Sequence, residues 1–145
     1  MKRLLPLAIG TVCALSAHAE RPSCTAPDGV EPIRSIRALP LPVRNAMLAE
    51  VKDMVDADQP YDDTDVVRHG AHFNRFAFSW NVGDDWIIVS ERGGFASSKP
   101  IYVIHWTRPG DTATLTGRQL GFQQKDLCAT ALQLLRFPGS ATPGR

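Results

Sequence analysis

The sequence predicts an α+β domain in which a four-stranded antiparallel meander is packed with two helices, in the order α-β-β-β-β-α, and carries one disulfide. Three observations lead to this prediction. Aromatic and β-branched residues concentrate in 71–107, apolar residues recur at helical spacing on either side of that stretch, and two cysteines remain after removal of an export signal. The same observations do not show what the protein does.

Four segments have strand-forming residues bounded by turn residues: His72–Trp80, Trp86–Glu91, Ile101–Thr107 and Thr112–Thr116. In the first, Phe76, Phe78 and Trp80 alternate, as a strand with one buried face requires. Loops are expected at 81–85 and 92–100 and at the turn 108–111. The three tryptophans and half of the other aromatic residues fall in these strands, so most of the aromatic area lies there and the sheet should form the core.

The register follows from symmetric pairing across the loops. It sets Trp80 opposite Trp86 and Phe78 opposite Ile88. It also sets Val89 opposite Tyr102 and Ile87 opposite Ile104. One face then collects Phe76, Phe78, Trp80, Trp86, Ile88, Ile101, Val103 and His105. The other collects Ile87, Val89, Tyr102, Ile104, Trp106 and Leu115.

Both faces of the predicted sheet are apolar, whereas a sheet exposed to water on one side should alternate. Two arrangements satisfy this pattern. One helix covers each face, or both helices cover one face and leave the other open as a partner or dimer surface. In the first case, the loop around Phe95 is the better contact candidate.

Two helices are predicted. The first starts at Pro40 and Pro42 and ends near Asp56, because prolines suit a first helical turn and Pro60 follows. Its apolar stripe consists of Leu41, Met47, Leu48, Val51, Met54 and Val55. The second runs from about Gln123 to Phe137, with a stripe of Leu127, Cys128, Ala131, Leu134 and Leu135.

Residues 1–19 have the layout of a secretory signal peptide: Lys2 and Arg3, an apolar run, and the cleavage site Ala17-His18-Ala19. The apolar run is too short to span a bilayer. The mature chain is therefore predicted to start at Glu20, to be periplasmic or secreted, and to form one domain over 20–137. Residues 20–38 are expected to be an extended arm and 138–145 a flexible tail.

Cleavage leaves Cys24 and Cys128, which are predicted to form a structural disulfide in an oxidising compartment. The bond closes a loop of about 105 residues, which the chain-entropy model values at roughly 4–5 kcal/mol as an upper figure. It ties the arm to the second helix.

The charge balance excludes some classes of partner. Without Lys2 and Arg3, 14 of the 16 basic residues remain against 15 acidic ones. No basic stripe stands out, so nucleic-acid binding is not expected. No segment after Ala19 is apolar for long enough to insert into a membrane.

Metal and cofactor sites are not predicted. His69 and His72 are three residues apart, a spacing that points to opposite faces of a strand, and His105 lies on another strand. An acidic loop, containing Asp56, Asp58, Asp62, Asp63 and Asp65, lacks the glycine and distal glutamate of a calcium loop. It is interpreted as a solvated connection in which Asp62 or Asp65 caps a turn, or as an acidic patch for a basic partner.

Two weaker hypotheses concern chemistry. Ser97 or Ser98 with His105 and an aspartate can be drawn as a triad, but no nucleophile-elbow motif frames either serine. Arg92-Gly-Gly94 with Lys99 is one way to hold an anion, but no helix N-terminus follows, which favours a plain loop.

The leading hypothesis is a small exported binding module that acts by contact with a protein partner, as inhibitors, immunity proteins and accessory subunits do. The candidate contact residues are Arg92, Phe95, Lys99, Tyr102, Ile104 and Trp106. One alternative is a small hydrolase that uses His105 with a carboxylate. Another is a structural or small-ligand-binding protein with a cavity between sheet and helices.

Overall fold

The computed structural model describes residues 31–66, 69–107, 112–120 and 127–136. Their elements are the 3-10 turn η2 (Ile36–Ala38), helices α1 (Leu41–Glu50) and α2 (Leu127–Arg136), and strands β1 (Met54–Val55), β2 (Asn74–Val82), β3 (Asp85–Arg92), β4 (Ile101–Trp106) and β5 (Ala113–Gln119). The predicted signal peptide, most of the predicted arm, Cys24 and the predicted tail lie outside the described residues.

The α+β class is confirmed, but the sheet differs from the prediction. It has five strands in the order β1-β2-β3-β4-β5. β1 runs parallel to β2, and the other neighbours are antiparallel. The prediction of four antiparallel strands was therefore wrong, because a two-residue strand such as β1 is too short to show an alternating pattern in the sequence.

Helix α1 begins where the prolines predicted and ends earlier than expected. Pro40 is its N-cap, and the extended Val51 closes it, with the Val51 N–H donating to the Met47 carbonyl at 2.9 Å. The chain then turns into β1 instead of continuing as helix to Asp56. Val43 and Met47, four positions apart, are the fully buried residues of α1, whereas Leu41 is 57 % exposed.

The hairpin between β2 and β3 is tighter than predicted. Val82 pairs with Asp85, so only residues 83 and 84 form the loop, and Gly83 has a φ of 64°. A two-residue loop with a left-handed glycine follows the twist of the flanking strands. The register consequently shifts by one residue, so that Trp80 lies opposite Ile87 and not opposite Trp86.

The β3–β4 register is also shifted by one, with Val89 opposite Ile101 and Ile87 opposite Val103. In β2, a register shift between Phe76 and Phe78 places these two rings on opposite faces. Phe78 instead stacks with Trp80 at 5.5 Å between ring centroids. The predicted face lists were therefore wrong in several members, because one bulge or one loop residue exchanges the faces of a strand.

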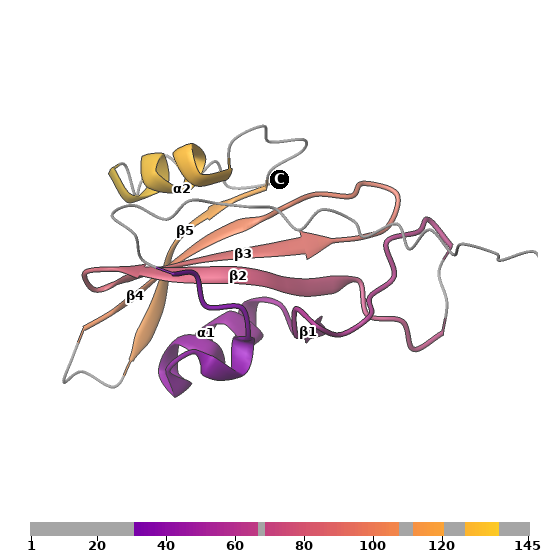
Figure 1. Ribbon diagram of the computed structural model, residues 1–145, viewed down its shortest axis with the longest axis horizontal. Coiled ribbons are helices and arrows are strands. Elements are labelled where there is room, and N and C mark those ends of the chain that lie inside the picture. The colour runs from indigo at the N-terminus through magenta and orange to yellow at the C-terminus, as the bar shows by residue number, and fades with distance from the viewer. Residues whose placement is uncertain (1–30, 67–68, 108–111, 121–126, 137–145) are drawn as a thin grey trace, which may run out of the picture.

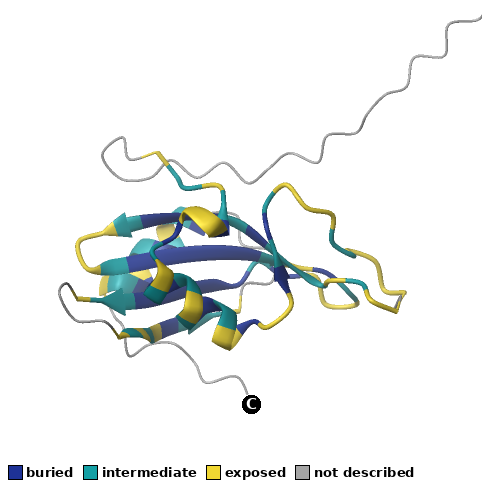
Figure 2. Ribbon diagram, turned by 90° about the horizontal axis from the view of Figure 1, so that it is seen from below, coloured by how far each residue is buried: buried dark blue, intermediate teal, exposed yellow. Residues whose placement is uncertain are grey.

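One helix covers each face of the sheet (Figure 1). The α1 face has its own core cluster, to which the strands contribute Phe76, Trp86, Ile88, Tyr102 and Ile104. The α2 face has another, built on Phe78, Trp80, Ile87, Val89, Ile101 and Val103 with Leu127, Ala131 and Leu134 of α2. The prediction that both central strands are apolar on both sides is confirmed, and the open-face arrangement is excluded. Exposed residues concentrate in the loops and on the outer side of α1 (Figure 2).

Candidate functional site

The loop that joins β3 to β4 is closed by a backbone bridge between Arg92 and Ser98. The Arg92 N–H donates to the Ser98 carbonyl at 2.8 Å, and the Ser98 N–H donates to the Arg92 carbonyl at 2.9 Å. Five residues, 93–97, therefore form the turn, with Phe95 at its centre. This tip loop, residues 92–99, was singled out by the sequence as a long loop with an aromatic residue between two cations.

The base of the tip loop rests on neighbouring backbone. Gly93 donates its N–H to the Phe73 carbonyl at 2.8 Å. A Cβ on Gly93 would lie 1.9 Å from the Asp62 carbonyl oxygen, so only glycine allows this approach. Asp62 in turn donates its N–H to the His72 carbonyl at 2.8 Å. The tip loop is thus fixed at its base to the acidic loop and to the start of β2.

The predicted contact residues separate into two groups. Phe95 is 93 % exposed, Arg92 is exposed and Lys99 is half-buried. Tyr102 and Ile104 are buried in the α1-face cluster, and Trp106 is half-buried against it. Those three side chains therefore do not form an open contact face. They were included because the sequence left open which sheet face a helix covers.

Two open pockets flank the tip loop. One, of about 500 Å³, lies on the side of Phe73, Leu120 and Asp53. The other, of about 360 Å³, lies between the tip loop and Tyr61 and Asp63 of the acidic loop. Both are at the surface, so neither is the cavity between sheet and helices that the small-ligand hypothesis needs, and that hypothesis stays a prediction.

The wall of the smaller pocket is a stacked and ion-paired group that the sequence analysis missed. The Arg75 guanidinium lies 4.2 Å from the Tyr61 ring centroid. It also donates to Glu91 Oε2 from Nε at 2.8 Å and from Nη2 at 2.5 Å. Burial and the nearby Glu91 charge raise the pKa of Tyr61. The signal available in the sequence was the cross-strand pairing of Arg75 with Glu91.

The other end of the sheet brings His105 together with a carboxylate and a hydroxyl. His105 Nδ1 lies 2.9 Å from Asp85 Oδ1, and His105 Nε2 lies 2.9 Å from Thr107 Oγ1. Asp85 and His105 are cross-strand partners. Ser97 and Ser98 follow the opposite end of β3, a whole strand away, so the triad drawn with either serine was wrong. The hydroxyl near His105 is that of Thr107, which the sequence analysis did not consider.

The acidic loop contains no cluster of metal ligands. Within the described residues, no three His, Cys, Asp or Glu side chains are grouped so as to hold a metal ion. Asp62 Oδ1 accepts hydrogen bonds from the N–H and hydroxyl of Thr64, at 2.9 and 2.5 Å, so the predicted turn cap is confirmed for Asp62. Asp58, Asp63 and Asp65 are exposed.

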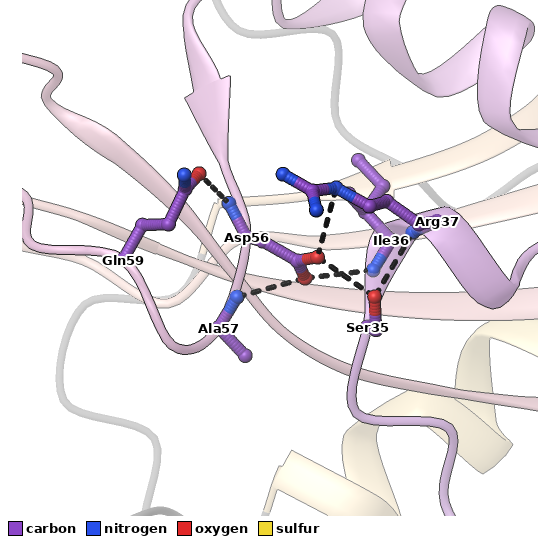
Figure 3. A network of polar contacts seen from close by, with 6 residues as sticks. All are labelled: Ser35, Ile36, Arg37, Asp56, Ala57 and Gln59. Atoms are coloured by element: carbon purple, nitrogen blue, oxygen red, sulfur yellow. Dashed lines mark hydrogen bonds and ion pairs between the residues drawn. The ribbon is translucent and has the colours of Figure 1, made fainter.

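Asp56 is different, because it is buried and fully engaged (Figure 3). Its carboxylate accepts from Ser35 Oγ at 2.7 Å and from the N–H groups of Ile36 and Ala57, each at 2.9 Å. Burial acts to raise its pKa, but these hydrogen bonds and the charge of Arg37 outweigh it and lower the pKa. Asp56 thus fastens the segment before α1 to the end of β1. Its role is structural.

Comparison with known protein families, curated proteins and solved structures gives no match. Within the described residues, no helix is both long enough and apolar enough to cross a membrane. The tip loop with its two pockets, and the Asp85–His105–Thr107 group, are the two candidate functional sites of the described residues.

Proposed function

We propose that this chain is a small exported binding module of the periplasm or cell exterior that acts by contact between its tip loop and a protein partner. The observation that carries this proposal is Phe95, a large aromatic side chain that is 93 % exposed on a loop with a fixed base. Single exposed apolar residues are common on protein surfaces. Aromatic residues and Arg are enriched in the cores of protein interfaces, so Phe95 and Arg92 of the tip loop have the composition of a contact.

The fixed base of the tip loop matters because groups that become ordered on binding lose conformational freedom, and this loss lowers the binding affinity. The Arg92–Ser98 bridge, the Gly93 hydrogen bond to Phe73 and the close approach of Gly93 to Asp62 already restrict the tip loop before binding. A contact residue presented in this way keeps more of its interaction energy as affinity. This favours a preorganised contact that acts by occlusion, as the proposed inhibitor, immunity or accessory roles require.

Export and the disulfide between Cys24 and Cys128 are part of the same proposal. Cys128 is half-buried at the start of α2, where it packs against the α2-face cluster. A bond to Cys24 would hold the segment before residue 31 near this helix. The chain's signal-peptide layout and its two remaining cysteines support secretion into an oxidising compartment.

The experiment that tests the contact is affinity capture from periplasmic extract with the mature protein, followed by affinity measurement with the partner identified. Phe95→Ala is expected to weaken binding at least about tenfold, since buried aromatic anchors dominate interfaces. Leu41→Ala is the matched control, because it also removes an exposed apolar side chain, at the start of α1 and away from the tip loop. The proposal is contradicted if the two variants bind equally, or if no saturable partner is captured.

A second function is supported by the Asp85–His105–Thr107 group, which matches the hydrolase alternative. The Thr107 hydroxyl is placed to attack an ester carbonyl while its proton passes to His105 Nε2, with Asp85 accepting from Nδ1–H. The bond to the ester's alcohol then breaks, and the alcohol leaves with the proton from His105. Water would then release the acyl group from Thr107. Because two contacts of 2.9 Å alone do not supply an oxyanion site, this candidate ranks below the binding module.

An ester assay decides whether the hydrolase candidate is kept. A hydrolase should cleave p-nitrophenyl acetate above the rate in buffer, and His105→Gln and Thr107→Val should each lower that excess by about 100-fold. Thr114→Val is the control, because Thr114 lies opposite His105 on β5 but outside the group. Equal rates for the parent and the three variants would rule out the hydrolase function.

A further inference from the structure

The larger pocket beside the tip loop brings apolar and charged side chains together in a space of about 500 Å³. Its apolar side chains include those of Phe73, Phe95 and Leu120. Its polar side chains are those of Asp53, Asn74, Arg92 and Ser98. Small-molecule sites have volumes of about 300–1,000 Å³ and combine apolar walls with a few polar groups. The larger pocket therefore has the size and the lining of a small-molecule site.

Three polar residues of this pocket form a continuous row on the α1 side of the sheet. Asn74 and Arg92 are cross-strand partners on β2 and β3, so their side chains project from the same side. Asn74 is two residues before Phe76 of the α1-face cluster, which identifies that side as the α1 side. Asp53 lies beside Asn74, because Asn74 Nδ2 donates to Asp53 Oδ1 at 2.6 Å. Burial raises the pKa of Tyr102, and the Arg92 charge is among the influences that oppose this rise, which agrees with a place on the α1 side.

Arg92 and Asp53 carry opposite charges in one pocket but do not pair with each other. Among the ion pairs of the described residues, none involves either side chain. The Asp53 carboxylate accepts from the Asn74 side chain and, at 3.4 Å, from the Phe73 N–H, and each of its oxygens can accept a second hydrogen bond. The Arg92 guanidinium is a fork of N–H donors. A ligand with both charges can therefore bridge the two side chains without breaking an existing ion pair.

We infer that the larger pocket binds a free α-amino acid with an apolar side chain. The carboxylate of the ligand accepts from Arg92, its ammonium group donates to Asp53, and its side chain lies against Phe73 and Leu120. An uncharged ligand leaves both protein charges unmatched, and a simple anion or cation is attracted by one of them and repelled by the other. This binding function goes beyond the contact of the tip loop with a protein partner and does not depend on it.

The test is an amide NMR titration of the mature protein with L-leucine at constant pH and ionic strength. The amides of Asn74, Gly94 and Leu120, which line the larger pocket, are expected to shift and saturate. The amides of Tyr61 and Lys99, which line only the smaller pocket, should not shift. A dissociation constant in the millimolar range is expected for two partly exposed charged contacts.

Three analogues test the parts of the ligand separately. N-acetyl-L-leucine lacks the ammonium group, L-leucinamide lacks the carboxylate, and glycine lacks the apolar side chain. Each is expected to bind at least about 3-fold more weakly than L-leucine. The amino-acid assignment is wrong if L-leucine shifts none of these amides at up to about 50 mM, which would saturate a millimolar site. It is also wrong if the analogues bind as well as L-leucine.

Variants connect each charge of the ligand to one side chain. Arg92→Gln and Asp53→Asn should each weaken L-leucine about 3- to 10-fold. Arg92→Gln should not weaken L-leucinamide, which has no carboxylate, and Asp53→Asn should not weaken N-acetyl-L-leucine, which has no ammonium group. This dependence on the ligand separates a direct contact from a general loss of structure. Lys99→Gln is the matched control, because Lys99 is a cation beside the tip loop that lines only the smaller pocket. An equal loss in Lys99→Gln and Arg92→Gln would overturn the assignment.

The outcomes separate this inference from the proposed function. If Phe95→Ala abolishes partner capture while L-leucine does not bind, the binding module stands and the amino-acid site is refuted. If L-leucine binds with the expected effects of the variants and no partner is captured, the amino-acid site stands and the proposed function is contradicted.

Discussion

Gly93 lies against the backbone of Asp62 so closely that a Cβ on Gly93 would be 1.9 Å from the Asp62 carbonyl oxygen. Real Cβ atoms do not approach backbone oxygen to that distance, so the two segments can pack in this way only while position 93 is glycine. This contact joins the acidic loop to the base of the tip loop. The contact therefore links the stability of the acidic loop to the position of Phe95 on the tip loop.

The first prediction follows from this contact. Gly93→Ala is expected to lower the free energy of unfolding by about 1–3 kcal/mol, because backbone must move to make room. Urea denaturation measures the loss. Gly117→Ala is the steric control, since its added Cβ would meet Val103 Cβ at 3.4 Å and cost less. If Gly93→Ala is as stable as the parent, residues 62 and 93 are not in contact in solution.

The second prediction concerns Asp56 and pH. Asp56→Asn should cost about 2 kcal/mol at pH 7, because the carboxylate accepts hydrogen bonds from buried donors that an amide serves less well. The folded-state pKa lies below the ordinary value of 3.8. The stabilisation is therefore fully present above about pH 4 and is lost as pH falls through the lowered folded pKa.

Denaturation midpoints of the parent and Asp56→Asn, measured from pH 7 to pH 2, should converge at the acid end. Asp58→Asn serves as the control, since Asp58 is exposed and its substitution should leave the midpoint nearly unchanged. A difference between parent and Asp56→Asn that stays constant over this range would show that the Asp56 charge does not stabilise the fold.

The third prediction separates core from contact among the residues that the sequence grouped together. Ile104→Ala should destabilise the protein by about 2–5 kcal/mol, because Ile104 is fully buried in the α1-face cluster. Phe95→Ala should change stability by less than about 0.5 kcal/mol, because Phe95 is exposed. Thermal denaturation of the two variants checks both values. A reversed order would contradict the placement of these two side chains.

The fourth prediction concerns processing and the disulfide. The exported protein should begin at Glu20 and be lighter than its reduced form by the mass of two hydrogens. Reduction should lower the free energy of unfolding by up to roughly 4–5 kcal/mol. Intact-mass analysis and alkylation without prior reduction check this. Alkylation of both Cys24 and Cys128 under those conditions would rule out the bond.

Much of the architecture was accessible from the sequence because its patterns are local. The prolines at 40 and 42 marked the start of α1, and the apolar runs 87–89 and 101–106 predicted central strands that are apolar on both sides. Residues 87–89 and 101–104 are buried, and residues 105 and 106 are half-buried. The tip loop was visible as a long segment with Phe95 between two cations. Each of these follows from the conformational or solvation preferences of neighbouring residues.

The predictions of strand register that the structure contradicts depend on single residues. The hairpin loop consists of two residues where five were expected, and the shift between Phe76 and Phe78 in β2 sends them to different faces. Side chains of a strand point alternately to the two faces of the sheet. A register change of one residue therefore moves a whole set of side chains between the α1 face and the α2 face. The pairing of Asp85 with His105 depended on the same register.

The sequence by itself determined the two helices and the four long strands, though not β1, and that Phe95 lies in a loop between Arg92 and Lys99, since these depend on local preferences and composition. The tertiary structure alone decided that α1 and α2 cover opposite faces, which buried Tyr102 and Ile104 and left Phe95 exposed. The physical reason is that both apolar faces of the sheet are stabilised by removal from water, so each face needs a cover. Which helix covers which face depends on chain connectivity and packing between residues that are far apart in the sequence.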